Sequence, residues 1–244
     1  MTYQMPDRLS KAEYVKNNFN VIARKYDIFN DLNSFFMHRL WKNKMAEIVE
    51  EFAREKGQIT CLDLCCGTGD ISQRLVAISK TAKVYSVDFS AEMLAIAKER
   101  LKDSAKSEIF TGDATNLKQF KNKSLDVVTI GFGLRNVNDL EKTLQEIFRV
   151  LKPGGIFINL DVGKVKIPLI KQLANFYFFK IVPIMGYLLW GGKNEMFDYL
   201  PASSVAYPDQ EKLALILRKT GFSDVKWKNF VFGNVAMHFA KIIS

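Results

Sequence analysis

Glycines and carboxylates follow consecutive β-like runs of the chain, a pattern suited to binding a nucleoside. The first run ends in LDLCCGTGD, whose turn residues are Asp63, Gly67, Thr68 and Gly69. Glycines in such a turn let backbone N–H groups approach a ligand at the N-terminus of the next helix. Asp88 ends the second run, and a carboxylate there can accept hydrogen bonds from both ribose hydroxyls.

The third run adds a further acid. It ends in GDA, so the Asp113 carboxylate can accept from the exocyclic amine of adenine while the Ala114 N–H reaches a ring nitrogen. Gly131, at the end of the fourth run, completes the predicted cofactor set. The full G-x-G-x-x-G of dinucleotide sites is missing, because Ser72 stands at its last position. We therefore favour an adenosyl site over NAD. The alternative for Asp63 is a structural acid that holds the loop.

The elements that must position these groups alternate along the chain. Short apolar, β-branched runs predict strands over 59–64, 83–88, 108–113, 125–132 and 155–162. Helical periodicity lies between them, most clearly over 140–151. Repeated strand and helix predict a doubly wound α/β fold with a parallel sheet. Beyond a helix that stops at Gly221, two strands joined at Gly233 and Asn234 predict an antiparallel end to that sheet.

We expect one domain over residues 1–244, in four parts. These are a helical N-terminal cap over 10–55, a cofactor-binding half over 59–163, a substrate-side insertion over 164–206, and a C-terminal helix and hairpin over 207–244. The insertion is expected over the carboxyl ends of the strands, where ligands of such folds bind.

Composition limits the partners. The chain has 244 residues and a net charge of +9, which indicates either an anionic partner or a solvated basic surface. The lysines are scattered rather than gathered in a run, so we expect no nucleic acid. Cys61, Cys65 and Cys66 are odd in number and clustered, which predicts neither disulfides nor a metal site and indicates a reducing compartment.

Two segments bear on location. Residues 1–18 contain no apolar core of a secretory signal, so a cytoplasmic protein is expected. The most apolar segment, 167–192, is interrupted by Lys171, Lys180 and Pro183, and we expect it to fall short of a membrane span.

A polar set lies inside an aromatic run just before the first strand. In YDIFNDLNSFFMHRLWK the polar and indole side chains are Tyr26, Asp27, Asn30, Ser34, His38 and Trp41. Ser34, His38 and Trp41 have the spacing of one helix face, which fits either a site or ordinary core.

Two resemblances follow from these stretches. The glycine loop with its acids resembles class I S-adenosylmethionine-dependent methyltransferases, whose sheet has seven strands with an antiparallel last strand. The pattern Y-D-x-x-N-x-x-x-S-x-x-x-H-x-x-W resembles the signature of the ubiquinone/menaquinone biosynthesis C-methyltransferases. FGLRNVND (132–139), RVLKPGG (149–155), YPDQEKL (207–213) and TGF (220–222) resemble that family too. The similarity runs from about residue 19 to the C-terminus.

The resemblance implies S-adenosyl-L-methionine as cofactor and C-methylation of a prenylated demethylquinol. Demethylmenaquinol is the expected substrate, with a ubiquinone precursor or another aromatic or lipid acceptor as alternatives. An alternative of another class is a non-catalytic subunit of a quinone-biosynthesis complex, but the intact cofactor set argues against it. A homodimer is a further expectation.

Four residues are candidates for the chemistry. Arg135 stays charged and would stabilise a phenolate or order a water, the alternative being a structural ion pair. Asn136 would hold that loop or a quinol oxygen, and Tyr26 would line or close the cleft as part of a lid. His38 has the pKa of a general base, although its spacing also fits a packed core histidine.

The chain departs from the family near the expected acceptor pocket. Asp161-Val162-Gly163-Lys164-Val165 replaces the usual Glu-x-Ser-Lys-Pro, Gly131 stands where Ser is common, and FDYLPASSVAYPDQ loosens a usually stricter segment. These changes bear on the acceptor more than on methyl transfer. A prenylated acceptor would also explain the apolar segment, whose Phe176, Tyr177, Phe178, Phe179 and Trp190 would form a hydrophobic mouth against an anionic membrane surface. The alternative is ordinary helix packing.

Overall fold

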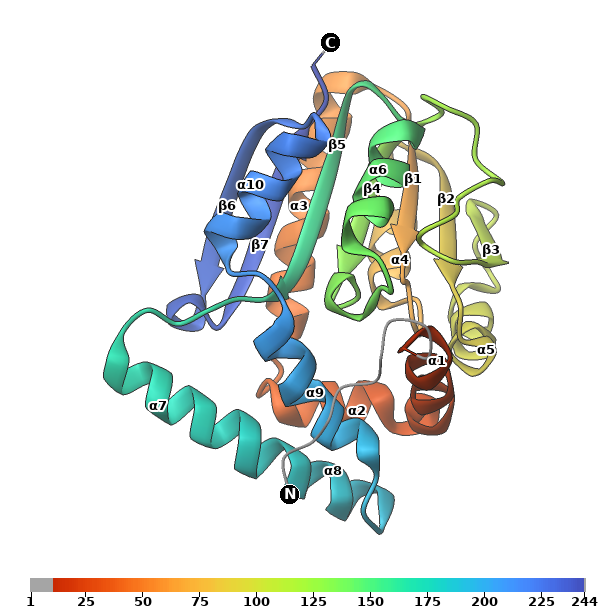
Figure 1. The fold of residues 1–244 in the computed structure, drawn as a ribbon. Helices are drawn as coiled ribbons and strands as arrows, with labels where there is room; N and C mark the ends of the chain where they lie inside the picture. Colours follow the sequence, from red (N-terminus) through yellow and green to blue (C-terminus); the bar gives the residue numbers. More distant parts are fainter. Residues whose placement is uncertain (1–10, 244) are drawn as a thin grey trace.

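The structure, a computed structural model, describes residues 11–243, and its centre is one seven-stranded sheet (Figure 1). The strand order is β3-β2-β1-β4-β5-β7-β6. The strands are β1 (Ile59–Leu64), β2 (Thr81–Asp88), β3 (Ser107–Thr111), β4 (Leu125–Gly131), β5 (Leu151–Val162), β6 (Ser223–Phe230) and β7 (Val235–Lys241). The first five run parallel, whereas β7 is antiparallel to both β5 and β6. The predicted doubly wound sheet with an antiparallel end is confirmed.

The central strands are apolar because both of their faces are covered. Every residue of β4 except Gly131 is buried, and β1 is buried at all positions but Thr60. Several boundaries differ from the prediction. The helix expected over 140–151 ends at Val150, and Leu151 already pairs with Leu125 as part of β5, which begins four residues before the predicted strand. Strand β3 ends at Thr111, so Asp113 lies in the loop after it.

The helices form two layers on the sheet and a third group beyond it. They are α1 (Lys11–Ile22), α2 (Tyr26–Asn33), α3 (Met37–Lys56), α4 (Asp70–Ala77), α5 (Ala91–Leu101), α6 (Leu140–Val150), α7 (Pro168–Phe176), α8 (Val182–Trp190), α9 (Glu195–Ala206) and α10 (Gln210–Thr220). Short turns of helix are η1 (Ala23–Lys25), η2 (Leu134–Asn136), η3 (Tyr177–Ile181) and η4 (Val231–Gly233). α3 and α4 share a core with one face of the sheet, and α6 and α10 cover the other face.

The third group of helices lies beyond the carboxyl ends of the parallel strands, at the bottom of Figure 1. There α1 and α2 meet α8 and α9 around a separate apolar cluster that includes Ile22, Phe29, Phe197 and Tyr199. The N-terminal cap and the insertion therefore cover the carboxyl ends of the parallel strands, where the glycine turn and the predicted acids lie. The boundaries proposed between the four parts stay predictions, and residues 1–10 and Ser244 lie outside the described residues.

The apolar insertion corrects one expectation. Lys171, Lys180 and Pro183 do not break it: α7, η3 and α8 form one continuous rod over Pro168–Trp190, which among the described residues is long and apolar enough to span a membrane by length and composition. A π-turn at Tyr177–Ile181 accommodates the proline, because the Val182 N–H bonds the Tyr177 carbonyl five residues back. The rod runs along the bottom of the molecule in Figure 1, below α9.

Candidate active site

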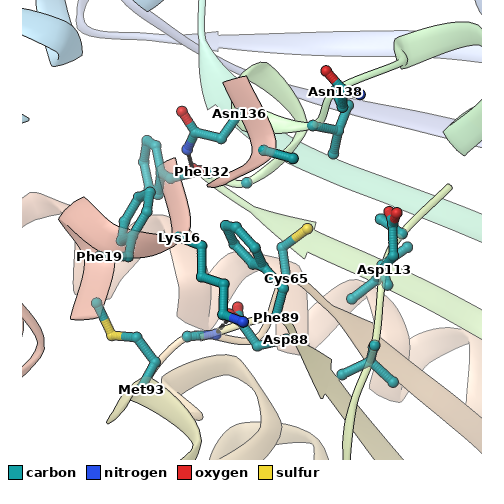
Figure 2. A pocket seen from close by; sticks show the side chains of 18 of the residues that line it. Lys16, Phe19, Cys65, Asp88, Phe89, Met93, Asp113, Phe132, Asn136 and Asn138 are labelled. Atoms are coloured by element: carbon teal, nitrogen blue, oxygen red, sulfur yellow. Dashed lines mark hydrogen bonds between the residues drawn. The ribbon is translucent and has the colours of Figure 1, made fainter. Parts of the chain in front are cut away.

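A cavity of about 350 Å³ lies at the carboxyl ends of β1, β2 and β4. Its lining includes the predicted cofactor residues Gly67, Asp88, Asp113, Ala114 and Gly131. Figure 2 shows Phe19 and Met93 on one side of this cavity and Asp113 on the other. Helix α1 closes it with residues that the sequence did not single out, namely Ala12, Glu13, Lys16 and Phe19. We call this the first cavity.

The glycine loop and Asp88 are bound to each other. Gly67 and Gly69 have φ of +55° and +79°, a region that glycine adopts without steric cost. The Gly67 N–H donates to one Asp88 carboxylate oxygen at 2.9 Å, and the Ser90 N–H donates to the other at 2.9 Å. Burial raises the pKa of Asp88 despite these bonds. Each carboxylate oxygen keeps a lone pair, so Asp88 can still accept from a ribose hydroxyl.

The adenine side of the cavity has the donor and acceptor that the sequence predicted. Asp113 accepts the Thr115 N–H with one oxygen at 2.8 Å, which leaves acceptor capacity on the other, and Ala114 follows it along the wall. Gly131 explains one departure from the family pattern. A Cβ there would lie 2.2 Å from the Ile71 Cδ1, so a serine fits only if that side chain moves.

Three predicted cofactor residues, Asp63, Thr68 and Gly69, are not among the residues that line the first cavity. Asp63 is fully buried and accepts hydrogen bonds from the Ser72 hydroxyl at 2.6 Å and the Thr129 hydroxyl at 3.1 Å. Burial raises its pKa to about 6. This is the geometry of an acid that holds the loop from beneath, the alternative weighed for Asp63. The Thr68 hydroxyl donates to Asp27 of α2 at 2.8 Å, so it binds the loop to the lid helix.

A second cavity of about 300 Å³ adjoins the first on the side of the insertion. Its walls come from α2, α3, α7 and η3 and are mostly aromatic or aliphatic, including Phe29, Trp41, Leu173, Tyr177 and Phe178. Tyr26 and Phe132 line both cavities. The arrangement therefore places the cavity that holds the glycine turn and the acids next to one lined mostly by apolar side chains.

Arg135 lies in the wall of this second cavity, held by a buried acid. Asp161 accepts from its guanidinium Nη1 at 2.6 Å and from its backbone N–H at 3.1 Å. Burial opposes the charge of Arg135, but the Asp161 carboxylate outweighs it and raises the pKa of Arg135. The Arg135 Nε–H is buried and has no hydrogen-bond partner among the described residues. Arg135 is thus ion-paired with Asp161 while its side chain lies in the wall of the second cavity.

Tyr26 and Asn136 have different surroundings. Tyr26 is the first residue of α2, beside both cavities, and burial raises the pKa of its hydroxyl. Asn136 lines only the first cavity of the two: its amide donates to the Phe132 carbonyl at 3.2 Å and accepts from the Tyr199 hydroxyl at 3.2 Å. These bonds support the loop-holding role for Asn136, and contact with a quinol oxygen stays a prediction.

His38 lines the second cavity, but its ring lies within a network of charges. Its Nε2 lies 2.8 Å from the Asp31 Oδ1, and its Nδ1 is 4.0 Å from the Asp70 Oδ2. Burial and the nearby Lys42 lower the pKa of His38, although both carboxylates oppose the shift. Its ring nitrogens thus face Asp31 and Asp70 of the protein, which favours the core reading over that of a free general base.

Several residues at the site were not predicted from the sequence. Asp161 lies 26 positions after its partner Arg135, and Tyr199 lies 63 positions after its partner Asn136. No local spacing in the sequence could have shown these contacts. Phe89 and Met93 line the first cavity immediately after Asp88. The one feature of the sequence that could have indicated these two residues is that Phe89 directly follows Asp88, the acid at the end of a strand.

The fold and the site define a class of enzyme. A seven-stranded sheet with an antiparallel β7, a glycine turn after β1, and acids after β2 and β3 define a class I S-adenosylmethionine-dependent methyltransferase. A solved S-adenosylmethionine-dependent methyltransferase from Aquifex aeolicus has the same fold, with a TM-score of 0.56, 18% identity, and coverage of 80% of this chain and 89% of that one. The sequence model of the ubiE/COQ5 methyltransferase family matches residues 8–241, and the chain belongs to that family.

Two curated relatives agree with this assignment. A demethylmenaquinone methyltransferase of Leptospira interrogans is 61% identical over 242 residues, which cover 98% of this chain and 96% of the relative. The corresponding protein of Desulfitobacterium hafniense is 40% identical over 231 residues, 93% of this chain and 89% of the relative. The resemblance drawn from the tyrosine-to-tryptophan stretch and the glycine loop is confirmed at the level of family.

Proposed function

We propose that the protein transfers a methyl group from S-adenosyl-L-methionine to a ring carbon of demethylmenaquinol, giving menaquinol in the cytoplasm. The observation that carries the proposal is the pair of adjoining cavities, one with nucleoside-binding acids and one apolar with a buried arginine, in a chain 61% identical to a demethylmenaquinone methyltransferase. Tyr26 and Phe132 lie where the two chambers meet, as the transfer requires.

The first cavity fits S-adenosyl-L-methionine. Asp88 would accept from the ribose, Asp113 and Ala114 would bind the adenine edge, and the Gly67 turn would pass beside the rest. The cofactor supplies an electrophilic methyl group on a sulfonium. The protein contributes position, because helix α1 and the glycine loop enclose the cavity from opposite sides.

Arg135 would activate the acceptor. A ring carbon becomes nucleophilic when a neighbouring quinol hydroxyl loses its proton, and the resulting phenolate needs a positive partner. Arg135 stays protonated, so its positive charge stabilises this anion and it does not take the proton itself. Water is then the proton acceptor that Arg135 orders. The proton on the methylated carbon leaves afterwards and restores the aromatic ring.

The test is transfer of labelled methyl to chemically reduced demethylmenaquinol, with a demethylated ubiquinol precursor measured in parallel. We expect label in the menaquinol ring carbon. In Arg135→Ala, kcat should fall by about 100- to 1,000-fold, as for loss of an oxyanion-stabilising donor. Cofactor affinity, measured by calorimetry, should stay within about twofold because Arg135 lines the other cavity.

Arg135→Lys is the matched control. It keeps the charge but loses the planar set of donors, so it should recover only part of the activity. Wild-type protein that binds the cofactor and labels neither quinol would overturn the proposed substrate. Arg135→Ala with wild-type kcat would overturn the role of Arg135 alone.

A further inference from the structure

The rod formed by α7, η3 and α8 is apolar on both of its faces. Toward the protein, Val182, Pro183 and Gly186 are buried, and Ile170 and Ala174 line the second cavity. On the outer face the large apolar side chains are at least half exposed: Leu169, Leu173, Phe176, Ile184 and Leu188. A helix on the surface of a water-soluble protein normally carries polar residues on its outer face.

Two other elements add exposed apolar side chains around the same cavity. Phe35 and Phe36, in the turn between α2 and α3, are 68% and 56% exposed, and Phe232 of η4 is 68% exposed. All three have positive φ, which is unfavourable for a bulky side chain. The Phe35 ring lies 5.9 Å from the Tyr177 ring, so the turn and the rod form a continuous surface.

This surface surrounds the mouth of the second cavity. Of the residues that line the cavity, Phe35, Leu173 and Val231 are more than a third exposed, and each comes from a different element. Their exposure marks where the cavity opens. The opening is therefore bordered by apolar side chains from the α2–α3 turn, α7 and η4.

The charge of the rod is of one sign. Between Asp161 and Glu195 the sequence has no acidic residue, and its lysines are Lys164, Lys166, Lys171, Lys180 and Lys193. Lys171 and Lys180 lie on the rod itself, are exposed, and have no ion-pair partner in the part of the chain that the structure describes. Exposed apolar residues beside unpaired lysines complement a bilayer surface with anionic headgroups.

We propose that an apolar rim, consisting of Phe35, Phe36, Leu169, Leu173, Phe176 and Leu188, docks flat on an anionic phospholipid bilayer. The mouth of the second cavity then opens toward the acyl chains, and Lys171 and Lys180 contact the headgroups. The rod lies in the interface because its other face packs on α9 and lines the cavity. The proposal deepens the proposed function, on which it rests for the lipid character of the acceptor.

Only some of the five aromatic residues that the sequence predicted at the hydrophobic mouth are exposed in the structure. Phe176 and Phe179 are exposed. Tyr177 and Phe178 instead line the inside of the second cavity. Trp190 packs against Phe29 and Phe197, with ring centroids 6.0 and 5.1 Å away.

The test is flotation of the purified full chain with vesicles of phosphatidylcholine alone or with about one third phosphatidylglycerol, without any quinol. We expect binding to the anionic vesicles, weakened by salt. The double variant Phe176→Glu/Leu188→Glu should bind at least about tenfold less, because it places charges on the docking face. Lys171→Glu/Lys180→Glu should weaken binding by about 30-fold or more, since each lysine near such a surface is worth roughly fivefold.

Leu215→Glu is the matched control. Leu215 is 54% exposed on α10, away from the rod, so its variant should bind as wild type does. Sedimentation without vesicles tests the other occupant, a second copy of the chain. A wild-type dimer that fails to bind vesicles and dissociates in Phe176→Glu/Leu188→Glu would overturn the proposal, as would vesicle binding equal in all variants.

A second readout separates this proposal from the proposed function. Phe176 and Leu188 do not line either cavity, so the double variant should methylate a demethylquinol with a short, water-soluble tail at the wild-type rate. It should lose activity, by about tenfold, only on quinol embedded in anionic vesicles. Failure of the wild type on the soluble quinol would count against the reaction and leave the vesicle-binding result to decide the docking.

Discussion

Asp161 and Arg135 form a buried ion pair in which the acid is one methylene shorter than the glutamate usual at this place in the family. The side chain of Asp161 is 1% exposed and that of Arg135 is 7% exposed. A buried charge that loses its partner is strongly destabilised, so each member constrains the other. The first departure from the family pattern thus preserves a carboxylate while changing its reach.

Asp161→Asn should lower kcat by about 10- to 100-fold, because Arg135 loses the charge that fixes its guanidinium at the second cavity. KM for the cofactor should hardly change. Asp161→Glu should keep most of the activity, since it retains a carboxylate opposite Arg135. Steady-state kinetics for both substrates, with melting temperatures to compare folding, check this. An asparagine variant with wild-type kcat would show that Arg135 needs no charged partner.

Helix α2 is tied to the glycine loop by side chains, and so is α5, whose Arg100 donates to the Thr68 hydroxyl at 3.1 Å. Asp27 forms an ion pair with Arg100 of α5 and accepts from the Thr68 hydroxyl of the loop, while Asp31 near the end of α2 binds Arg39 at 2.6 Å. Helix α2 therefore connects the cofactor loop with the second cavity, which it also lines.

Asp27→Ala should loosen α2 and raise KM for both substrates by about fivefold, the equivalent of about 1 kcal/mol for a partly exposed pair, with less effect on kcat. Hydrogen exchange over residues 26–33 should quicken in the same variant. Glu50→Ala, which removes the exposed pair with Arg54 on α3, should change neither. Unaltered exchange in Asp27→Ala would mean that packing alone holds α2.

The elements divide into those that local pattern could predict and those that it could not. The parallel strands were predictable because burial on both faces makes them continuous apolar runs, and the glycine turn because it needs φ above zero at Gly67 and Gly69. The π-turn before Pro183 was not, because it depends on which carbonyl the Val182 N–H reaches in three dimensions. The exposure of the outer apolar face of the rod could not be predicted either, since helical periodicity does not show which apolar face packs against the protein.

Stability as a whole should depend on pH through Asp63. Its pKa of about 6 in the folded protein lies above its ordinary value of 3.8, so the folded state binds the proton more tightly than the unfolded state. Protonation therefore stabilises the fold as pH falls through 6. Compared with Asp63→Asn, the wild type should gain about 2 kcal/mol of unfolding free energy between pH 7 and pH 4.

Urea unfolding of both proteins across that range measures the difference, in which the other titrating groups cancel. A difference in unfolding free energy between wild type and Asp63→Asn that stays constant with pH would show that Asp63 is solvated in the folded protein.

Tyr26 and Phe132 are the common boundary of the two chambers, and this division has a kinetic meaning. One chamber is enclosed by α1 and the other opens between α7 and the α2–α3 turn, so each reactant has its own route. The spent nucleoside can be exchanged while a quinol waits, and a methylated quinol can depart while the nucleoside stays. We expect turnover in such an enzyme to have no compulsory order of arrival and, with the apolar rim docked as proposed, its rate to follow the abundance of acceptor within the lipid phase rather than in the surrounding water.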